Sequence, residues 1–79
     1  MSGVKYRVVG VEGEELHPDE YLFDTPEEAE DRFYMLGWSM LSVIRTVFIE
    51  KIVIENEKIV RQEIHKILKT VGEENYISN

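Results

Sequence analysis

The first third of the chain passes from an apolar, strand-like segment to a polar one. Residues 4–11 read VKYRVVGV. They are rich in valine and include a tyrosine, and both residue types are enriched in strands. We therefore expect the chain to open with a strand over 4–11, in which Gly10 marks a bulge or a close approach of another segment. Residues 12–20 are polar and form a connection, and residues 21–23 are expected to return as a short second strand.

A dense group of helix-start signals follows. Thr25 is a capping residue, Pro26 fits the first helical position, and Glu28 completes a capping box while favouring the positive end of the helix dipole. Gly37 suits the position just after the last helical residue. The pattern predicts a helix over 26–36, whose apolar residues at i, i+4 and i+7 form one stripe toward the core: Ala29, Phe33 and Leu36.

The second half of the chain is expected to hold one long strand and one helix. Eight of the fourteen residues in 41–54 are Val, Ile or Thr, which favours a long bent or bulged strand over the competing helix. A helix is predicted over 57–71, after a cap at Asn56, because apolar residues fall at helical spacing: Val60, Ile64, Ile67, Leu68 and Val71. The alternative is a hairpin through 55–58 with a strand at 59–64.

These elements predict an α+β fold in the order β-β-α-β-α, with an antiparallel or mixed sheet and the helices packed on one face. The 79 residues leave room for a single domain, 1–79, whose tail 72–79 is expected to fray. A chain this short buries only about 60% of its unfolded surface, so a homodimer would add stability. Without an apolar run of membrane-spanning length or a secretory signal, we expect a cytoplasmic protein.

Nearly all of the net charge of −7 arises from one stretch, residues 12–31, which contains ten acidic residues and no Lys or Arg. Such a concentration repels phosphate and attracts basic proteins. Two interpretations follow: the acids keep a small protein soluble, or they form a docking surface for a basic partner. The expected surface residues are Glu20, Asp24, Glu27, Glu28, Glu30, Asp31 and Trp38, the last because tryptophan either forms interface hot spots or packs in the core.

No residue pattern indicates catalysis, a cofactor or a metal. The chain has no cysteine, and His17 and His65 fall outside any metal-ligand spacing. The carboxylates of 12–15 and 19–20 lack the calcium-loop pattern, and neither a phosphate-binding glycine loop nor a nucleophile elbow occurs. We therefore expect a protein that is not an enzyme and that binds no cofactor and no metal.

Part of the chain resembles a known family. Residues 4–10, the run 26–29 with Tyr34 and Gly37, and the stretch 44–52 are similar to the archaeal ribosomal protein LX family, and the β-α-β rhythm is similar to the N-terminal segments of type II secretion F-type proteins. The resemblance covers residues 4–52 and implies a ribosome- or RNA-associated domain. The ribosomal family is expected to be basic, whereas this chain is acidic.

The leading hypothesis is a non-catalytic acidic interaction module that presents its acids to a basic or nucleic-acid-binding protein and does not itself bind nucleic acid. Small acidic domains of phages and other mobile elements often act as inhibitors in this way, some as nucleic-acid mimics, and the analogy suggests that class of function. The alternative is the ribosome- or RNA-associated domain, which would use a basic stripe on the last helix: Lys58, Arg61, Lys66 and Lys69.

Overall fold

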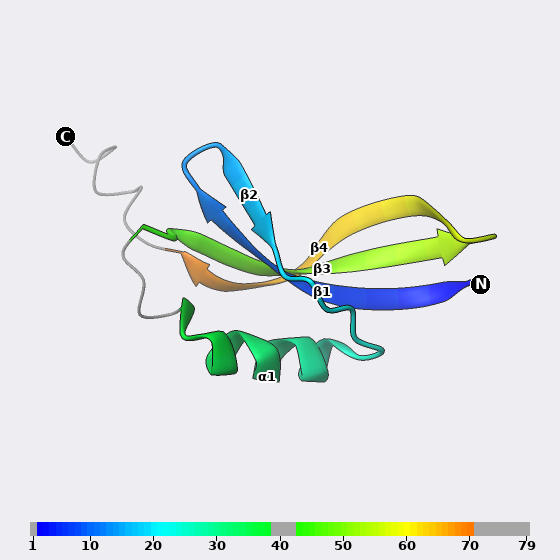
Figure 1. Cartoon of the computed structure of the whole chain (residues 1–79), viewed down its shortest axis with the longest axis horizontal. Coiled ribbons are helices and arrows are strands. Elements are labelled where there is room, and N and C mark those ends of the chain that lie inside the picture. The colour runs from blue at the N-terminus through cyan, green and yellow to red at the C-terminus, as the bar shows by residue number, and fades with distance from the viewer. Residues whose placement is uncertain (1, 39–42, 71–79) are drawn as a thin grey trace.

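The computed structural model describes residues 2–38 and 43–70 and shows a four-stranded antiparallel sheet with a helix packed on one face (Figure 1). The order along the chain is β-β-α-β-β, and the order in the sheet is β2-β1-β3-β4. The bounds are Gly3–Glu12 for β1, Glu15–Pro18 for β2, Pro26–Leu36 for α1, Thr46–Glu55 for β3 and Lys58–Thr70 for β4. The predicted α+β class is confirmed. Among the described residues, no helix combines the length and apolar character needed to cross a membrane.

Helix α1 begins and ends where its capping signals predict. Thr25 is extended (φ −129°, ψ 152°), and its Oγ1 accepts a hydrogen bond from the backbone N–H of Glu28 at 3.2 Å and donates one to the Glu28 carboxylate at 3.1 Å. Pro26 occupies the first turn, and Gly37 closes the helix with φ 75°, a left-handed conformation that glycine adopts without a steric penalty. Local chemistry alone therefore sets both ends of this helix.

The prediction of a second helix over 57–71 is wrong. The described part of this segment is strand β4, which forms a hairpin with β3. Asn56 and Glu57 make a two-residue turn and both have positive φ, 53° and 67°, as in the tight hairpin turns that match the twist of the flanking strands. The alternative of a hairpin through 55–58 is confirmed, and its strand continues beyond residue 64 to Thr70.

Register shifts in the β3–β4 ladder explain why the apolar spacing of β4 imitates a helix. Ile64 lies opposite Glu50 and Ile67 opposite Phe48, so the two isoleucines are three residues apart on β4 but face positions two apart on β3. An i, i+3 spacing therefore falls on one side of a strand that carries an extra residue between the two positions. The residues of β4 without a directly opposed partner on β3 are Val60, His65 and Leu68.

The second strand lies earlier in the chain than predicted. Gly13 has φ 62°, which permits a tight turn, so β2 pairs with the end of β1 at once, beginning with Glu12 opposite Glu15. Residues 21–23 were expected to be this strand, but they form only an isolated bridge, between Phe23 and Tyr6. The predicted strand 4–11 is confirmed as β1. The strand predicted over 41–54 is confirmed from Thr46 onward as β3, whereas residues 43–45 are not part of a strand, and residues 41 and 42 and the tail 71–79 lie outside the described residues.

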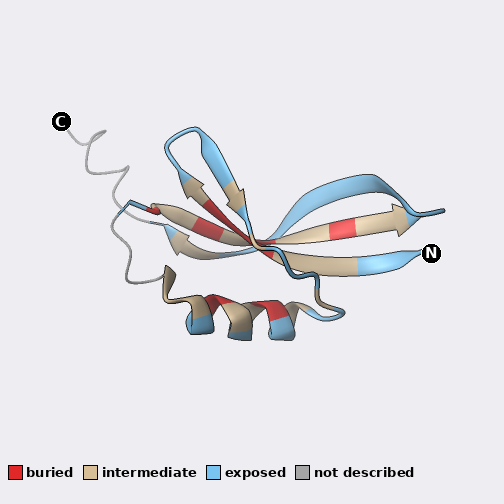
Figure 2. Cartoon of the chain, in the orientation of Figure 1, coloured by how far each residue is buried: buried red, intermediate tan, exposed pale blue. Residues whose placement is uncertain are grey.

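The buried core lies between α1 and the middle of the sheet, as the red segments of Figure 2 show. Val8 on β1 faces Ile49 on β3, and Ala29 and Phe33 of α1 cover them. Because side chains alternate across a strand, this face also carries Tyr6 and Val47. Ala29 and Phe33 belong to the predicted helix stripe, so the helix presents the expected face to the core.

Gly10 allows the tryptophan after the helix to reach the sheet. A β-carbon at Gly10 would lie 3.1 Å from Cζ3 of Trp38 and 3.3 Å from Cγ2 of Ile44, which is too close without a shift of these side chains. Trp38 is half-buried and packs against the core. The close approach predicted at Gly10 is therefore confirmed, and Trp38 serves the core rather than lying free on the surface.

The sheet face opposite α1 is not covered by any other described element (Figures 1 and 2). Its centre is polar: the Arg7 guanidinium binds the Glu50 carboxylate at 2.7 Å, and the Gln62 amide donates to the same carboxylate at 3.2 Å. Val9 and Ile52 on this face are buried by their neighbours in the sheet. One face of the sheet is thus the core and the other is a charged cluster among apolar residues.

Replacing the capping threonine tests this account of the helix. Thr25→Ala should lower the free energy of unfolding by about 1 kcal/mol, because two N-terminal hydrogen bonds lose their partner. Urea unfolding gives the value, with Thr25→Ser expected to keep most of the stability. The control is Thr70→Ala at the exposed end of β4, and an equal loss in both alanine variants would contradict the capping role.

Candidate functional site

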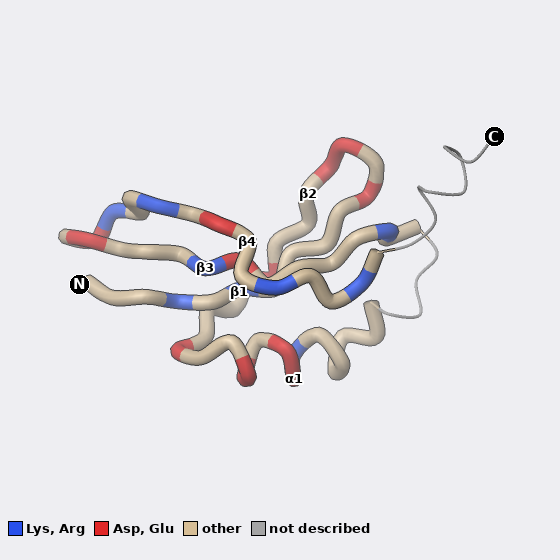
Figure 3. Tube along the Cα trace, turned by 180° about the vertical axis from the view of Figure 1, so that it is seen from behind, with Lys and Arg blue, Asp and Glu red and all other residues tan. Residues whose placement is uncertain are grey.

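The acid-rich stretch 12–31 is continuous in sequence but divided in the fold. Figure 3 shows acidic residues at the β1–β2 turn and on α1, and basic residues along β1 and β4. The acidic residues of this stretch therefore do not gather on a single surface, although they are contiguous in the sequence. They form two acidic patches, one on the β1–β2 hairpin and one on α1, and the two patches differ in the residues that surround the carboxylates.

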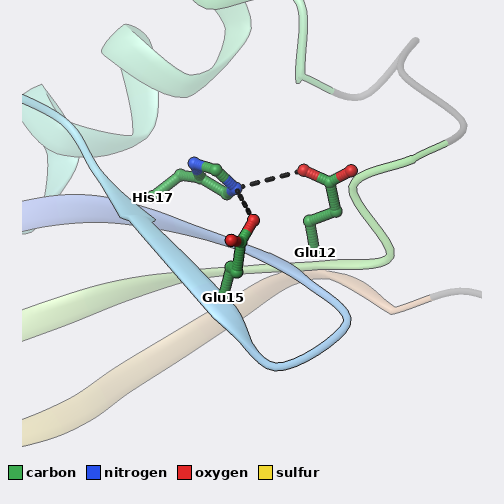
Figure 4. Close-up of side chains that lie close together, drawn as sticks. All are labelled: Glu12, Glu15 and His17. Carbon is green, nitrogen blue, oxygen red and sulfur yellow. Dashed lines mark hydrogen bonds and ion pairs between the residues drawn. The ribbon is translucent and has the colours of Figure 1, made fainter.

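The hairpin patch gathers two carboxylates around a histidine (Figure 4). Nε2 of His17 lies 3.2 Å from Oε1 of Glu12 and 3.9 Å from Oε1 of Glu15. One donor atom from each residue lies within 4.8 Å of the others, so the three offer a ligand set to a cation. The two carboxylates are exposed and no further His, Cys, Asp or Glu of the described chain joins the set, which makes an ordinary surface ion pair the simplest interpretation.

A nearly buried ion pair joins the polar connection to α1. Nε of Arg32 donates to Oδ2 of Asp19 at 2.8 Å, and Nη2 donates to Oδ1 at 3.3 Å, while the Asp19 side chain is only 7% exposed. This hydrogen bond raises the pKa of the Arg32 guanidinium above its ordinary value, against the opposing effect of burial. The guanidinium also lies 4.6 Å above the ring of Tyr21, a cation–π arrangement. Together these contacts hold residues 19–21 against the helix.

Two more acids of the stretch are bound by cations from distant strands. Nζ of Lys5 on β1 binds Asp24, and Nζ of Lys66 on β4 lies 3.2 Å from Oε1 of Glu30 on α1. Asp24 and Glu30 were predicted to present their charge to a partner, but within the described chain each already has a cation. The expected docking surface is smaller than the sequence indicates.

A hollow of about 270 Å³ lies between α1 and residues 21–23, and we call it the α1 hollow. Tyr21, Phe23 and Met35 supply its apolar surface, and the carboxylates of Glu28 and Asp31 belong to its lining. Met35 is 75% exposed and Tyr21 is 49% exposed, so the hollow presents apolar surface to water. Arg32 also lines the hollow: Nε and Nη2 of its guanidinium donate to Asp19, while Nη1 donates to Sδ of Met35 at 3.8 Å.

The structure brings together some of the predicted interaction residues and separates others. Glu28 and Asp31 line the α1 hollow, and exposed Glu27 lies one helical turn before Asp31. Glu20 is exposed and next to Tyr21. The sequence interpretation missed Tyr21 and Met35, although Met35 falls outside the predicted Ala29, Phe33 and Leu36 stripe, and this position was the available signal.

Comparisons with known proteins return no matching family model, no matching curated protein and no matching solved structure. The resemblance to the ribosomal protein LX family gains no support from them. Arguments about function therefore rest on the geometry of the chain.

The ion pair between Asp19 and Arg32 should matter more for stability than the pair between Lys5 and Asp24. Asp19 is 7% exposed and makes two hydrogen bonds to the guanidinium, whereas Asp24 is 76% exposed. Asp19→Asn should lower the thermal midpoint by roughly twice as much as Asp24→Asn or more, because exposed ion pairs contribute little. Calorimetry of the two isosteric variants measures this, and equal shifts would show that the loop is held by other contacts.

Proposed function

We propose that this chain is a non-catalytic interaction module that binds a basic segment of another protein through the α1 hollow. The observation that carries the proposal is the lining of this hollow, where exposed Tyr21 and Met35 lie beside the carboxylates of Glu28 and Asp31. Apolar surface next to fixed negative charge suits a lysine or arginine side chain, which has an apolar stem and a charged head. An acidic surface that served solubility alone would not need this apolar component.

In the proposed complex, the stem of a basic residue packs on Tyr21 and Met35, and its head binds the carboxylate of Asp31 or Glu28. Glu27 and Glu20 extend the negative charge around this contact and favour the approach of a basic partner. The contact between Arg32 and Asp19 has a further role here, since it directs the resident guanidinium toward Asp19. The carboxylate of Asp31 is then left to an incoming cation, and the Glu28 carboxylate would add to it while it also accepts the hydrogen bond from Thr25.

The sequence indicates two candidate functions, and the observations that bear on each of them are different. Inhibition of a basic or nucleic-acid-binding protein fits the hollow, and it stays a proposal by analogy with small acidic domains. The ribosome- or RNA-associated alternative required a basic stripe on a helix, but its four residues lie on strand β4. Two of them are engaged with carboxylates, Lys66 with Glu30 and Arg61 with Glu63.

Charge reversal on the helix, compared with the same reversal on the hairpin, tests the α1 hollow. The probe is a synthetic peptide that alternates arginine and leucine, titrated into isotope-labelled protein and followed by nuclear magnetic resonance. Glu27→Lys with Asp31→Lys should weaken binding roughly tenfold, because the rim charges are lost. Shift changes in the unmodified protein should centre on Tyr21, Glu28 and Met35.

The matched control is Glu14→Lys with Glu15→Lys on the hairpin, which changes the net charge by the same amount. Binding by the control variant should stay close to that of the unmodified protein. If both double variants lose affinity equally, the peptide responds to net charge alone, and the acids of the helix serve solubility rather than docking.

The same proposal predicts that the chain does not bind nucleic acid directly. At about 150 mM salt, duplex DNA or RNA should not form a complex of micromolar affinity, because the acidic residues oppose the approach of phosphate. Gel-shift titration at two salt concentrations measures this. A tight complex that Lys58→Glu with Arg61→Glu abolishes would favour the RNA-associated alternative instead.

A further inference from the structure

The two outer edges of the sheet differ in how far the rest of the chain covers them. The edge of β1 is paired with β2, and beyond β2 it is closed by further backbone bonds: Asp19 N–H to Val8 C=O at 2.8 Å, and a reciprocal pair between Tyr6 and Phe23, each at 2.8 Å. The other edge is β4, and within the part of the chain that the structure describes no segment pairs with its outer side. The outer strands of the sheet are therefore β2, which has 4 residues and ends in Pro18, and β4, which has 13 residues.

Strand β4 is longer than an edge strand usually is, although it carries basic residues and three register shifts of the kind that protect edges. It runs for 13 residues without a proline, whereas natural edge strands tend to be short or interrupted. Figure 2 shows it exposed over most of its length. Four of its five large apolar side chains are 54–58% exposed, and only Leu68 packs against the core. The four exposed residues are Ile59, Val60, Ile64 and Ile67. A strand of this kind is a template for pairing with another chain.

We propose that β4 pairs antiparallel with β4 of a second copy of this chain, around a twofold axis at Gln62. This inference concerns a surface other than the α1 hollow and goes beyond the proposed function. The two sheets would join into one of eight strands. Because a twofold axis through an antiparallel pair is perpendicular to the sheet, both copies of α1 would lie on the same side.

The order of charges along β4 selects the second copy as the occupant. With Gln62 on the axis, Arg61 of each copy lies opposite Glu63 of the other, so two ion pairs form by symmetry. The stretch 61–64 is regular, because the register shifts of β4 fall outside it.

Neighbouring registers are less favourable. An axis at Glu63 would set two like charges directly opposite each other, which is destabilising. An axis at Ile64 would place Arg61 opposite Ile67, so the guanidinium would keep its contact with Glu63 of its own chain but would have no carboxylate opposite it on the other copy. The register at Gln62 sets Lys58 opposite Lys66, but Lys66 already binds Glu30 at 3.2 Å, so its charge is balanced within its own chain.

The first test measures mass and uses a charge swap. Sedimentation velocity over a concentration series should show a species of twice the 9.3 kDa chain mass. Glu63→Arg should raise the dissociation constant of the dimer roughly tenfold or more, because two like-charge pairs replace two ion pairs. The double variant Arg61→Glu with Glu63→Arg should restore dimerisation, since it exchanges the partners without removing them.

The control variants distinguish a loss of pairing between two copies from a loss of folding within one copy. Glu14→Arg makes the same charge change on the hairpin and should leave the dimer unchanged. Glu63 lies opposite Lys51 and 3.7 Å from the Arg61 guanidinium within its own chain, so Glu63→Arg also affects the fold. The swapped variant restores the contact with Arg61 inside the chain as well as between copies, so the masses are compared only between variants of equal thermal stability. Circular dichroism confirms that each variant is folded before its mass is measured.

The second test locates the axis. The chain has no cysteine, so Gln62→Cys carries a single thiol that would face its own symmetry mate. Opposed residues in antiparallel strands have Cα atoms about 4.5–5.5 Å apart, within the range that a disulfide spans. Mild oxidation should link Gln62→Cys into a covalent dimer at concentrations where Glu14→Cys stays largely unlinked.

Two results would overturn the proposal. One is a chain that stays monomeric up to several hundred micromolar, which would leave the β4 edge to a strand of a different protein. The other is a dimer that Glu63→Arg does not weaken, which would place the interface elsewhere. Neither result bears on the α1 hollow, because the peptide titration uses residues on α1 and the segment before it.

Discussion

A single helix of 11 residues has to cover a four-stranded sheet, and the arrangement of the molecule follows from that constraint. At 1.5 Å per residue the helix is about 16 Å long, whereas the molecule extends 48 Å along its longest axis. The helix therefore covers only the centre of one face, where Val8, Phe33 and Ile49 form the core. The far face, the β4 edge and much of the β3–β4 hairpin are left to water or to another chain.

The acidic residues illustrate how a fold redistributes charge that appears uniform in sequence. Asp19 is nearly buried and holds Arg32, which in turn lies over Tyr21. Asp24 and Glu30 are balanced by Lys5 and Lys66, which come from strands far away in sequence. The charge that remains toward water on the helix lies beside apolar surface, and this combination distinguishes a binding surface from a purely solubilising one.

Local signals predicted the parts of the fold that local chemistry controls. Thr25 and Pro26 mark the start of the helix and Gly37 marks its end, so the range of the helix could be predicted from the sequence. Strand β4 was not, because its extra residues give isoleucines a helical spacing, and only the pairing partner on β3 reveals which face they share. The candidate site was predicted in part for the same reason. Glu28 and Asp31 were identified from the sequence, but Tyr21 is placed beside them by tertiary contacts, in which Asp19 binds Arg32 and the Arg32 guanidinium lies over the Tyr21 ring.

The closed edge of β1 has a consequence for how large an assembly of this chain can grow. Polymers built from sheet edges need two free edges per molecule, one to receive a strand and one to offer the next. Here β2 and the segment through Phe23 occupy one edge with bonds from the same chain. The remaining edge at that end is β2, which offers only 4 residues and ends in a proline that has no N–H to donate. Association along the sheet direction is therefore far more favourable at β4 than at β2, so the fold favours a finite particle over a fibre even though it carries a long exposed strand.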